Sequence, residues 1–191
     1  MQHIMIDLET MDDTPTAAIV AIGAVAFDLN SGEIGEQFYL SVDLDSSYKH
    51  GGTIGPGAVK WWLRQPREAQ CEIVTDNAAT INYALRELEC FIIRSSPSTD
   101  TILWSQGADF DFPIITSAMA RIGMRRCWKY WNVRDVRTIV HAAEEAGFNP
   151  SAAVDFVGQK HHALHDAIHQ TRILLRAWQN LVKPHRNEPQ L

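Results

Sequence analysis

The chain has 191 residues, 46% of them hydrophobic, which is enough for one globular domain with a substantial core. It has no apolar run of about 18 residues, which excludes a membrane-spanning helix, and its N-terminus lacks the basic and apolar parts of a signal peptide. Three widely spaced cysteines contain no CxxC pair. They exclude a cysteine zinc site and a disulfide framework, and they suit the reducing cytoplasm.

The net charge of −6 argues at first sight against a nucleic-acid partner. The charges are unevenly distributed, however. Residues 1–50 hold nine acidic residues and one basic residue, whereas residues 121–137 hold six basic residues and one acidic residue. A basic cluster is usually a solvated face. This polarity also suits an enzyme whose metal ions attract phosphate and whose arginines hold the nucleic-acid backbone.

Three strands are predicted in the N-terminal region. Residues 4–10 form the first, residues 17–27 form a long apolar strand buried on both faces, and residues 37–42 form the third. Residues 30–32 (Asn-Ser-Gly) are typical of a hairpin turn. We therefore expect an antiparallel meander.

Helices and strands alternate in the rest of the chain, which predicts a mixed five-stranded α/β sheet flanked by helices. One domain is expected over residues 1–182, followed by a C-terminal tail at 183–191. The expected elements are a loop over 48–57, a short helix over 58–63, an amphipathic helix over 77–94, a strand over 101–104, a helix over 112–122, a strand over 128–133, a helix over 135–146, a loop over 149–160 and a helix over 166–182.

Two carboxylates lie at the end of the first strand. Asp7 and Glu9 are two residues apart, so their side chains project to the same face, about 7 Å apart along the strand. Burying two like charges is costly unless a divalent cation lies between them. The alternative is a strand whose polar end lies at the sheet edge.

Two further segments carry acidic residues at predicted helix starts. Asp109 and Asp111 lie just past a strand, where either could simply cap the following helix. His161 and Asp166 are five residues apart across a loop-to-helix junction and could face one cavity. A histidine-rich helix start is otherwise a solvated face.

The order Asp-x-Glu, then Asp, then His-x4-Asp resembles the DEDDh 3′–5′ exonucleases, a superfamily with an RNase H-like fold that includes RNase T, oligoribonuclease and the proofreading exonucleases. The resemblance extends from Asp7 to about Leu181. The segments IVAIGAVAFD, VKWWLRQ, RDVRT and HHALHDAIHQ look like its RNase AS-like, or exodeoxyribonuclease VIII-like, branch. That branch implies a compact stand-alone nuclease and a potential homodimer.

The resemblance implies that four carboxylates hold two metal ions and that His161 deprotonates the attacking water. Oxygen ligands point to Mg²⁺ or Mn²⁺ rather than Zn²⁺. The family pattern favours Asp111 over Asp109, and His161 over His162 and His165. The implied metal ligands are Asp7, Glu9, Asp111 and Asp166, with Asp7 bridging both ions.

A 3′-end enzyme must also hold the terminal base, which aromatic or apolar side chains do without reading sequence. Met11 is expected to wedge against that base. Trp61 and Trp62 are neighbours on a helix, so one is expected in the core and the other at the surface or against a base. The remaining candidates for substrate contact are Thr10, Phe110, Arg134, Arg137 and Lys160.

The sequence therefore predicts a metal-dependent 3′–5′ exonuclease that acts on single-stranded or frayed 3′ ends and releases nucleoside 5′-monophosphates. Two alternatives are an inactive nucleic-acid-binding module of the same fold and an endonuclease of the RNase H type. The choice between RNA and DNA stays open, because the residues that would contact a 2′-hydroxyl cannot be placed from sequence.

Overall fold

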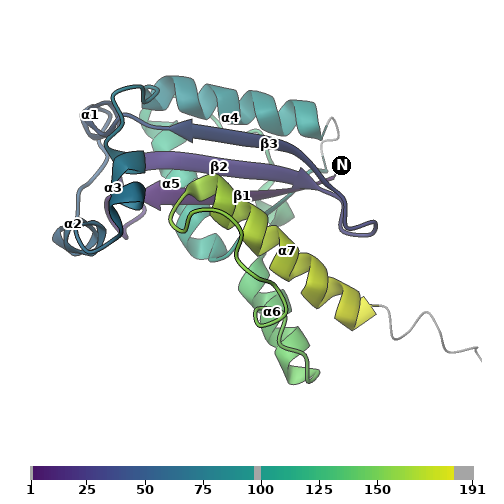
Figure 1. Ribbon diagram of the computed structural model, residues 1–191. Helices are drawn as coiled ribbons and strands as arrows, with labels where there is room; N and C mark the ends of the chain where they lie inside the picture. The colour runs from purple at the N-terminus through teal and green to yellow at the C-terminus, as the bar shows by residue number, and fades with distance from the viewer. Residues whose placement is uncertain (1, 97–99, 183–191) are drawn as a thin grey trace, which may run out of the picture.

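The computed structural model describes residues 2–96 and 100–182, and the expected tail at 183–191 lies outside them. Its centre is a five-stranded sheet in the order β3-β2-β1-β4-β5. Figure 1 labels the first three of these strands, β3, β2 and β1. β1 pairs antiparallel with β2, and β2 with β3, whereas β4 is parallel to both β1 and β5. The mixed α/β sheet predicted from the sequence is confirmed. Its strands are β1 His3–Thr10, β2 Ile19–Phe27, β3 Ile34–Ser41, β4 Ile102–Ser105 and β5 Val133–Asp135.

The side chains of β1 alternate between two hydrophobic layers. Ile4, Ile6 and Leu8 pack with residues of α4 (Ile81–Ser95) and α5 (Ala108–Arg121). Met5 packs on the other face with α6 (Val136–Glu145) and α7 (Ala163–Val182), the helix that crosses the front of the sheet in Figure 1. Because strand side chains alternate, Asp7 and Glu9 share the α7 face with Met5.

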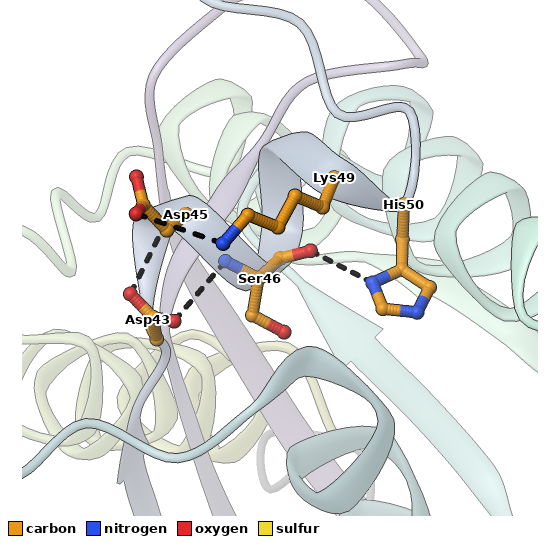
Figure 2. Close-up of polar contacts among 5 residues, drawn as sticks. All are labelled: Asp43, Asp45, Ser46, Lys49 and His50. Atoms are coloured by element: carbon orange, nitrogen blue, oxygen red, sulfur yellow. Dashed lines mark hydrogen bonds and ion pairs between the residues drawn. The ribbon is translucent and has the colours of Figure 1, made fainter.

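Helix α1 (Leu44–Lys49) was not predicted from the sequence, and its last two residues fall within the loop predicted over 48–57. The Asp43 carboxylate accepts hydrogen bonds from the backbone N–H groups of Asp45 (3.2 Å) and Ser46 (3.1 Å), which caps the helix (Figure 2). At the other end, the His50 ring contacts the Ser46 carbonyl at 2.8 Å. A six-residue helix is too short for its hydrophobic period to be read in sequence.

A hydrogen bond to Asp135 explains why α5 begins before the predicted residue 112. Its Oδ1 accepts from the N–H of Arg137 and caps α6 as expected, while its Oδ2 accepts from the N–H of Ala108 at 2.9 Å. This long-range cap lets α5 begin at Ala108 instead of residue 112. Sequence reasoning could not find it because the two residues are 27 positions apart.

Other boundaries also differ from those predicted. The last strand is Val133–Asp135 rather than 128–133, because Trp128 packs edge-on against Phe112 and Tyr130–Asn132 forms a 3-10 turn. Helix α7 begins at Ala163 rather than at residue 166. Two short helices, α2 (Pro56–Trp62) and α3 (Arg67–Ile73), gather with α1 at the end of the sheet where β1 ends (Figure 1). Within residues 2–96 and 100–182, no helix has the length and hydropathy of a membrane span.

Candidate active site

The end of β1 lies directly against the start of α7. Asp7 pairs with Gly23 of β2, and a Cβ atom at Gly23 would lie 2.2 Å from the carbonyl carbon of Ala163. A glycine at this position therefore allows the two backbones to touch. This contact brings the His161–Asp166 segment over the face of the sheet that carries Asp7 and Glu9.

Glu9, His161 and Asp166 form the centre of the site. The potential ligand atoms of these three side chains all lie within 4.8 Å of one another. Glu9 is 8% exposed, and burial together with the charges of Asp166 and Asp111 raises its pKa to about 8. Burial also raises the pKa of Asp166, against the opposing effect of hydrogen bonding to the His161 backbone.

Asp7 lies beside this centre and is held from α7. Gln170 Nε2 donates a hydrogen bond to Asp7 Oδ1 at 2.7 Å. Burial and the neighbouring charges of Asp111 and Glu9 raise the pKa of Asp7 well above its ordinary value. Gln170 was not predicted from the sequence. The available signal was its position four residues after Asp166, which places both on one face of the helix.

Asp111 and Asp109 have different surroundings. Asp111 is buried, and burial raises its pKa to about 7. Asp109, on the same helical turn, is exposed. The structure thus brings Asp111 to Asp7 and leaves Asp109 at the surface.

The three neighbouring histidines are also distinguished by their contacts. His161 has a left-handed backbone (φ 62°) and lies edge-on to Trp61, with 4.7 Å between ring centroids. His162 is instead stacked between Tyr39 and His165, at 4.1 Å from each. Tyr39 donates in turn to Glu72 at 2.7 Å. His162 and His165 therefore anchor the loop, while His161 projects into the site.

A cavity of about 210 Å³ opens beside Glu9. The two tryptophans divide as expected: Trp62 is buried and donates from Nε1 to the Thr10 carbonyl at 2.9 Å, whereas Trp61 is 41% exposed. The cavity wall includes three predicted substrate contacts, Thr10, Trp61 and Phe110, together with Leu8, Asp12, Ala58 and Trp62.

Met11 does not fit its expected role as a wedge. The side chain is 7% exposed and packs in a hydrophobic cluster with Val20 and Trp62. A residue that contacts the terminal base needs an accessible surface. We therefore correct the sequence-based expectation and assign Met11 to the core.

The three basic residues predicted to bind phosphate lie at different places relative to the carboxylates. Arg137 is close enough to Asp111 for its charge to lower the pKa of that carboxyl, and it lies near Gly107. Arg134 points elsewhere, because its guanidinium donates to the carbonyls of Trp131 (2.6 Å) and Val133 (2.9 Å). Lys160 lies over the ring of Phe156 at 5.9 Å. Arg137 is thus the cation nearest to the carboxylates, while Arg134 is turned away from them.

The donor set suits divalent cations. Carboxylate oxygens are the preferred ligands of Mg²⁺ and Mn²⁺. Buried Glu9 and Asp111 and half-buried Asp7 supply them. The charges of these carboxylates raise one another's pKa, so the site favours added positive charge. The residues present therefore fit the metal centre that was expected.

Comparison with known proteins identifies the family. The model of the Rv2179c-like 3′-5′ exoribonuclease domain matches residues 2–178. The chain belongs to this family. It is a 3′–5′ exonuclease domain of the DEDDh superfamily, whose members use divalent metal ions. A curated relative is an exodeoxyribonuclease of Enterobacteria phage T4, 26% identical over 166 residues, which cover 74% of this chain and 72% of the phage protein.

Solved structures share the fold at low identity. Cell-death related nuclease 4 has a TM-score of 0.64 at 16% identity, and the match covers 91% of this chain and 62% of that one. This chain thus spans less than two thirds of that neighbour's length. The nuclease domain of 3′hExo, a DEDDh family member bound to rAMP, has a TM-score of 0.59 at 16% identity, with 93% and 91% covered. These likenesses confirm the RNase H-like fold.

Proposed function

We propose that the domain removes nucleotides one at a time from the 3′ end of single-stranded or frayed nucleic acid and releases nucleoside 5′-monophosphates. Asp7, Glu9, Asp111 and Asp166 would hold two Mg²⁺ or Mn²⁺ ions. The observation that supports this proposal best is the cluster of Glu9, Asp166 and His161, with their polar atoms within 4.8 Å of one another. A base and two acidic ligands meet there at one end of a cavity.

Each side chain has a task in phosphodiester hydrolysis. Bound divalent ions would lower the pKa of water and offset the charge on the leaving oxygen. His161 accepts a proton from the attacking water while the oxygen of that water bonds to phosphorus. The bond from phosphorus to the 3′ oxygen then breaks, and that oxygen takes a proton from solvent. Asp166 offers a carboxylate oxygen within 4.8 Å of a ring nitrogen of His161, so a metal ion held by Asp166 would lie close to the base.

The cavity beside Glu9 would hold the terminal nucleotide. Trp61 offers an exposed aromatic face next to His161, and Phe110 lines the same cavity. Stacking of this kind is worth about 1–3 kcal/mol per base and does not depend on base identity. Thr10 and Arg137 are the polar contacts that we assign to the sugar and the phosphate.

Digestion of a 5′-labelled single-stranded oligonucleotide tests the proposal. We expect a ladder of shortening products with Mg²⁺ or Mn²⁺, none in EDTA, and none from the Asp7→Asn variant. Asp109→Asn is the matched control, since it removes an exposed carboxylate on the same helix as Asp111, and it should digest like the wild type. Undiminished activity of Asp7→Asn would refute the site assignment.

The same assay separates the alternatives. An inactive binding module would leave the oligonucleotide intact, and an RNase H-type endonuclease would cut a circular single strand, which has no 3′ end. We propose RNA as the preferred substrate because the matching family is described as exoribonucleases, although the phage relative is named for DNA. Matched RNA and DNA strands of adenine-rich and mixed sequence provide the comparison.

Three further expectations belong to this proposal. A single domain spans residues 1–182, and limited proteolysis should leave it intact. The cysteines Cys71, Cys90 and Cys127 are all unpaired and exposed, which supports a cytoplasmic location. A homodimer would appear in light scattering at twice the mass of 21.5 kDa.

A further inference from the structure

A row of basic side chains runs along α7 away from the candidate active site. His169, Arg172 and Arg176 follow Asp166 at intervals of three, three and four residues, so all four lie on one face of the helix. At 1.5 Å per residue, Arg172 is about 9 Å and Arg176 about 15 Å along the helix from Asp166. The row begins three residues after Asp166, which is the last proposed metal ligand along the chain.

Arg172 and Arg176 line a second cavity, of about 410 Å³. Its other walls come from the turn between β2 and β3, which includes Gly32, and from the loop before α7, which includes Asp155. Asp155 is the one carboxylate among the described residues that line this cavity. The two arginines outnumber it, so the cavity carries net positive charge.

Both arginines are available to bind an anion. Within residues 2–96 and 100–182, neither guanidinium forms an ion pair or a hydrogen bond to another residue. Elsewhere in the described chain, Arg94 is held by Glu36 and Arg121 by the His50 carbonyl. Unpaired arginines with planar groups of five donors are well suited to phosphate.

An aromatic ring and further cations connect this cavity to the active site. The centroid of the Phe156 ring lies 4.8 Å from that of His169, and Lys160 Nζ lies over the Phe156 ring at 5.9 Å from its centroid. Burial is the main cause of the lowered pKa of His169, and the charges of Arg172 and Lys160 contribute to it. The basic groups therefore lie close together from Asp166 to the cavity. Cations interleaved with aromatic rings are typical of surfaces that bind single-stranded nucleic acid.

We call the second cavity and the neighbouring side chains of Lys160, Phe156 and His169 the groove. We propose that the groove binds the substrate strand upstream of the scissile bond, with Arg172 and Arg176 on backbone phosphates. The inference rests on the proposed function, since it assigns the groove to the strand whose 3′ end is hydrolysed. The contacts are with phosphates rather than with base edges, so the groove binds without sequence preference.

Binding of a 5′-fluorescent single-stranded 20-mer in EDTA, measured by anisotropy over a range of salt concentrations, tests the groove without requiring catalysis. The Arg172→Gln/Arg176→Gln variant should bind about tenfold more weakly at moderate salt. The slope of log K against log[salt] should fall in magnitude by about 1.4, since each single-strand phosphate contact contributes about 0.7. Arg172→Lys/Arg176→Lys should retain most of the affinity and the slope.

The matched control is Arg86→Gln/Arg125→Gln, which removes the same charge from two exposed positions on α4 and beyond α5. It should leave the affinity and the salt slope nearly unchanged. Equal losses in the two double variants, or no loss in either, would overturn the assignment of the groove.

Turnover gives a second, independent readout. The Arg172→Gln/Arg176→Gln variant should raise KM for the 20-mer and leave kcat/KM for a dinucleotide unchanged, because a dinucleotide is too short to reach both arginines. An equal loss on both substrates would contradict the groove. Arginine-dependent binding by a wild-type protein that digests neither substrate would retain the groove and refute the exonuclease proposal.

Discussion

Gly23 of β2 lies in direct contact with Ala163, the first residue of α7. The contact is possible because Gly23 has no Cβ atom, and its strand partner is Asp7. The close approach of these two backbones determines how far α7 descends onto the sheet. It therefore sets the distance from Asp7 to the residues that α7 carries.

We expect Gly23→Ala to impair both stability and activity. A methyl group at this position would meet main-chain atoms of Ala163 and Leu164 at 2.2–2.3 Å, so α7 must shift, at a cost of about 1–3 kcal/mol. Urea unfolding and kcat/KM measure the two effects. Gly57→Ala is the control, because nothing lies within 4 Å of its added Cβ. A wild-type profile for Gly23→Ala would show that the contact does not position α7.

Gln170→Leu should weaken metal binding without unfolding the protein. Gln170 is 8% exposed, and its amide orients the Asp7 carboxylate through the 2.7 Å hydrogen bond. Loss of a partner that orients a metal ligand reduces the affinity for the metal by about 10-fold or more. Calorimetric titration with Mn²⁺ measures the change. Gln179→Leu, farther along α7, should bind Mn²⁺ like the wild type, and equal affinities in both variants would remove Gln170 from the site.

The metal-free protein should lose stability as the pH rises from about 5 to 8. The folded-state pKa values of Glu9 and Asp111 are raised to about 8 and about 7. Between the unfolded and folded pKa values the folded protein binds more protons than the unfolded chain, so stability falls with rising pH. Saturating Mg²⁺ should remove most of this loss, because the cation replaces the protons.

Thermal melts in EDTA, with Glu9→Gln beside the wild type, isolate this effect from the titration of histidines elsewhere in the protein. Glu9→Gln removes one of the raised groups and should flatten the dependence of Tm on pH. Parallel curves for the two proteins would show that the folded protein does not raise the pKa of Glu9.

His161→Gln should reduce kcat by at least about 100-fold, which is the lower part of the range for a general base. His162→Phe is its partner experiment. A phenyl ring can keep the stack between Tyr39 and His165, so activity should stay close to that of the wild type. If His162→Phe were the inactive variant instead, the assignment of the base would move to His162.

Local sequence was sufficient for the part of the site that one strand carries. The period of two in β1 predicts that Asp7 and Glu9 share a face, and the apolar run of β2 predicts burial on both sides. Both predictions agree with the structure, in which every residue of Ile19–Phe27 is buried. These properties follow from backbone geometry within one element, so they need no knowledge of the partners.

The contacts between distant segments could not be predicted in the same way. Gln170 and Asp7 are 163 residues apart, and their hydrogen bond depends on the depth at which α7 packs against Gly23. Neighbours from other elements likewise determine three further features: the burial of Met11, the exposure of Trp61 and the hydrogen bond from Ala108 to Asp135. Spacing along a chain determines which side chains share a face, whereas packing between elements determines which faces meet and which side chains remain open to a substrate.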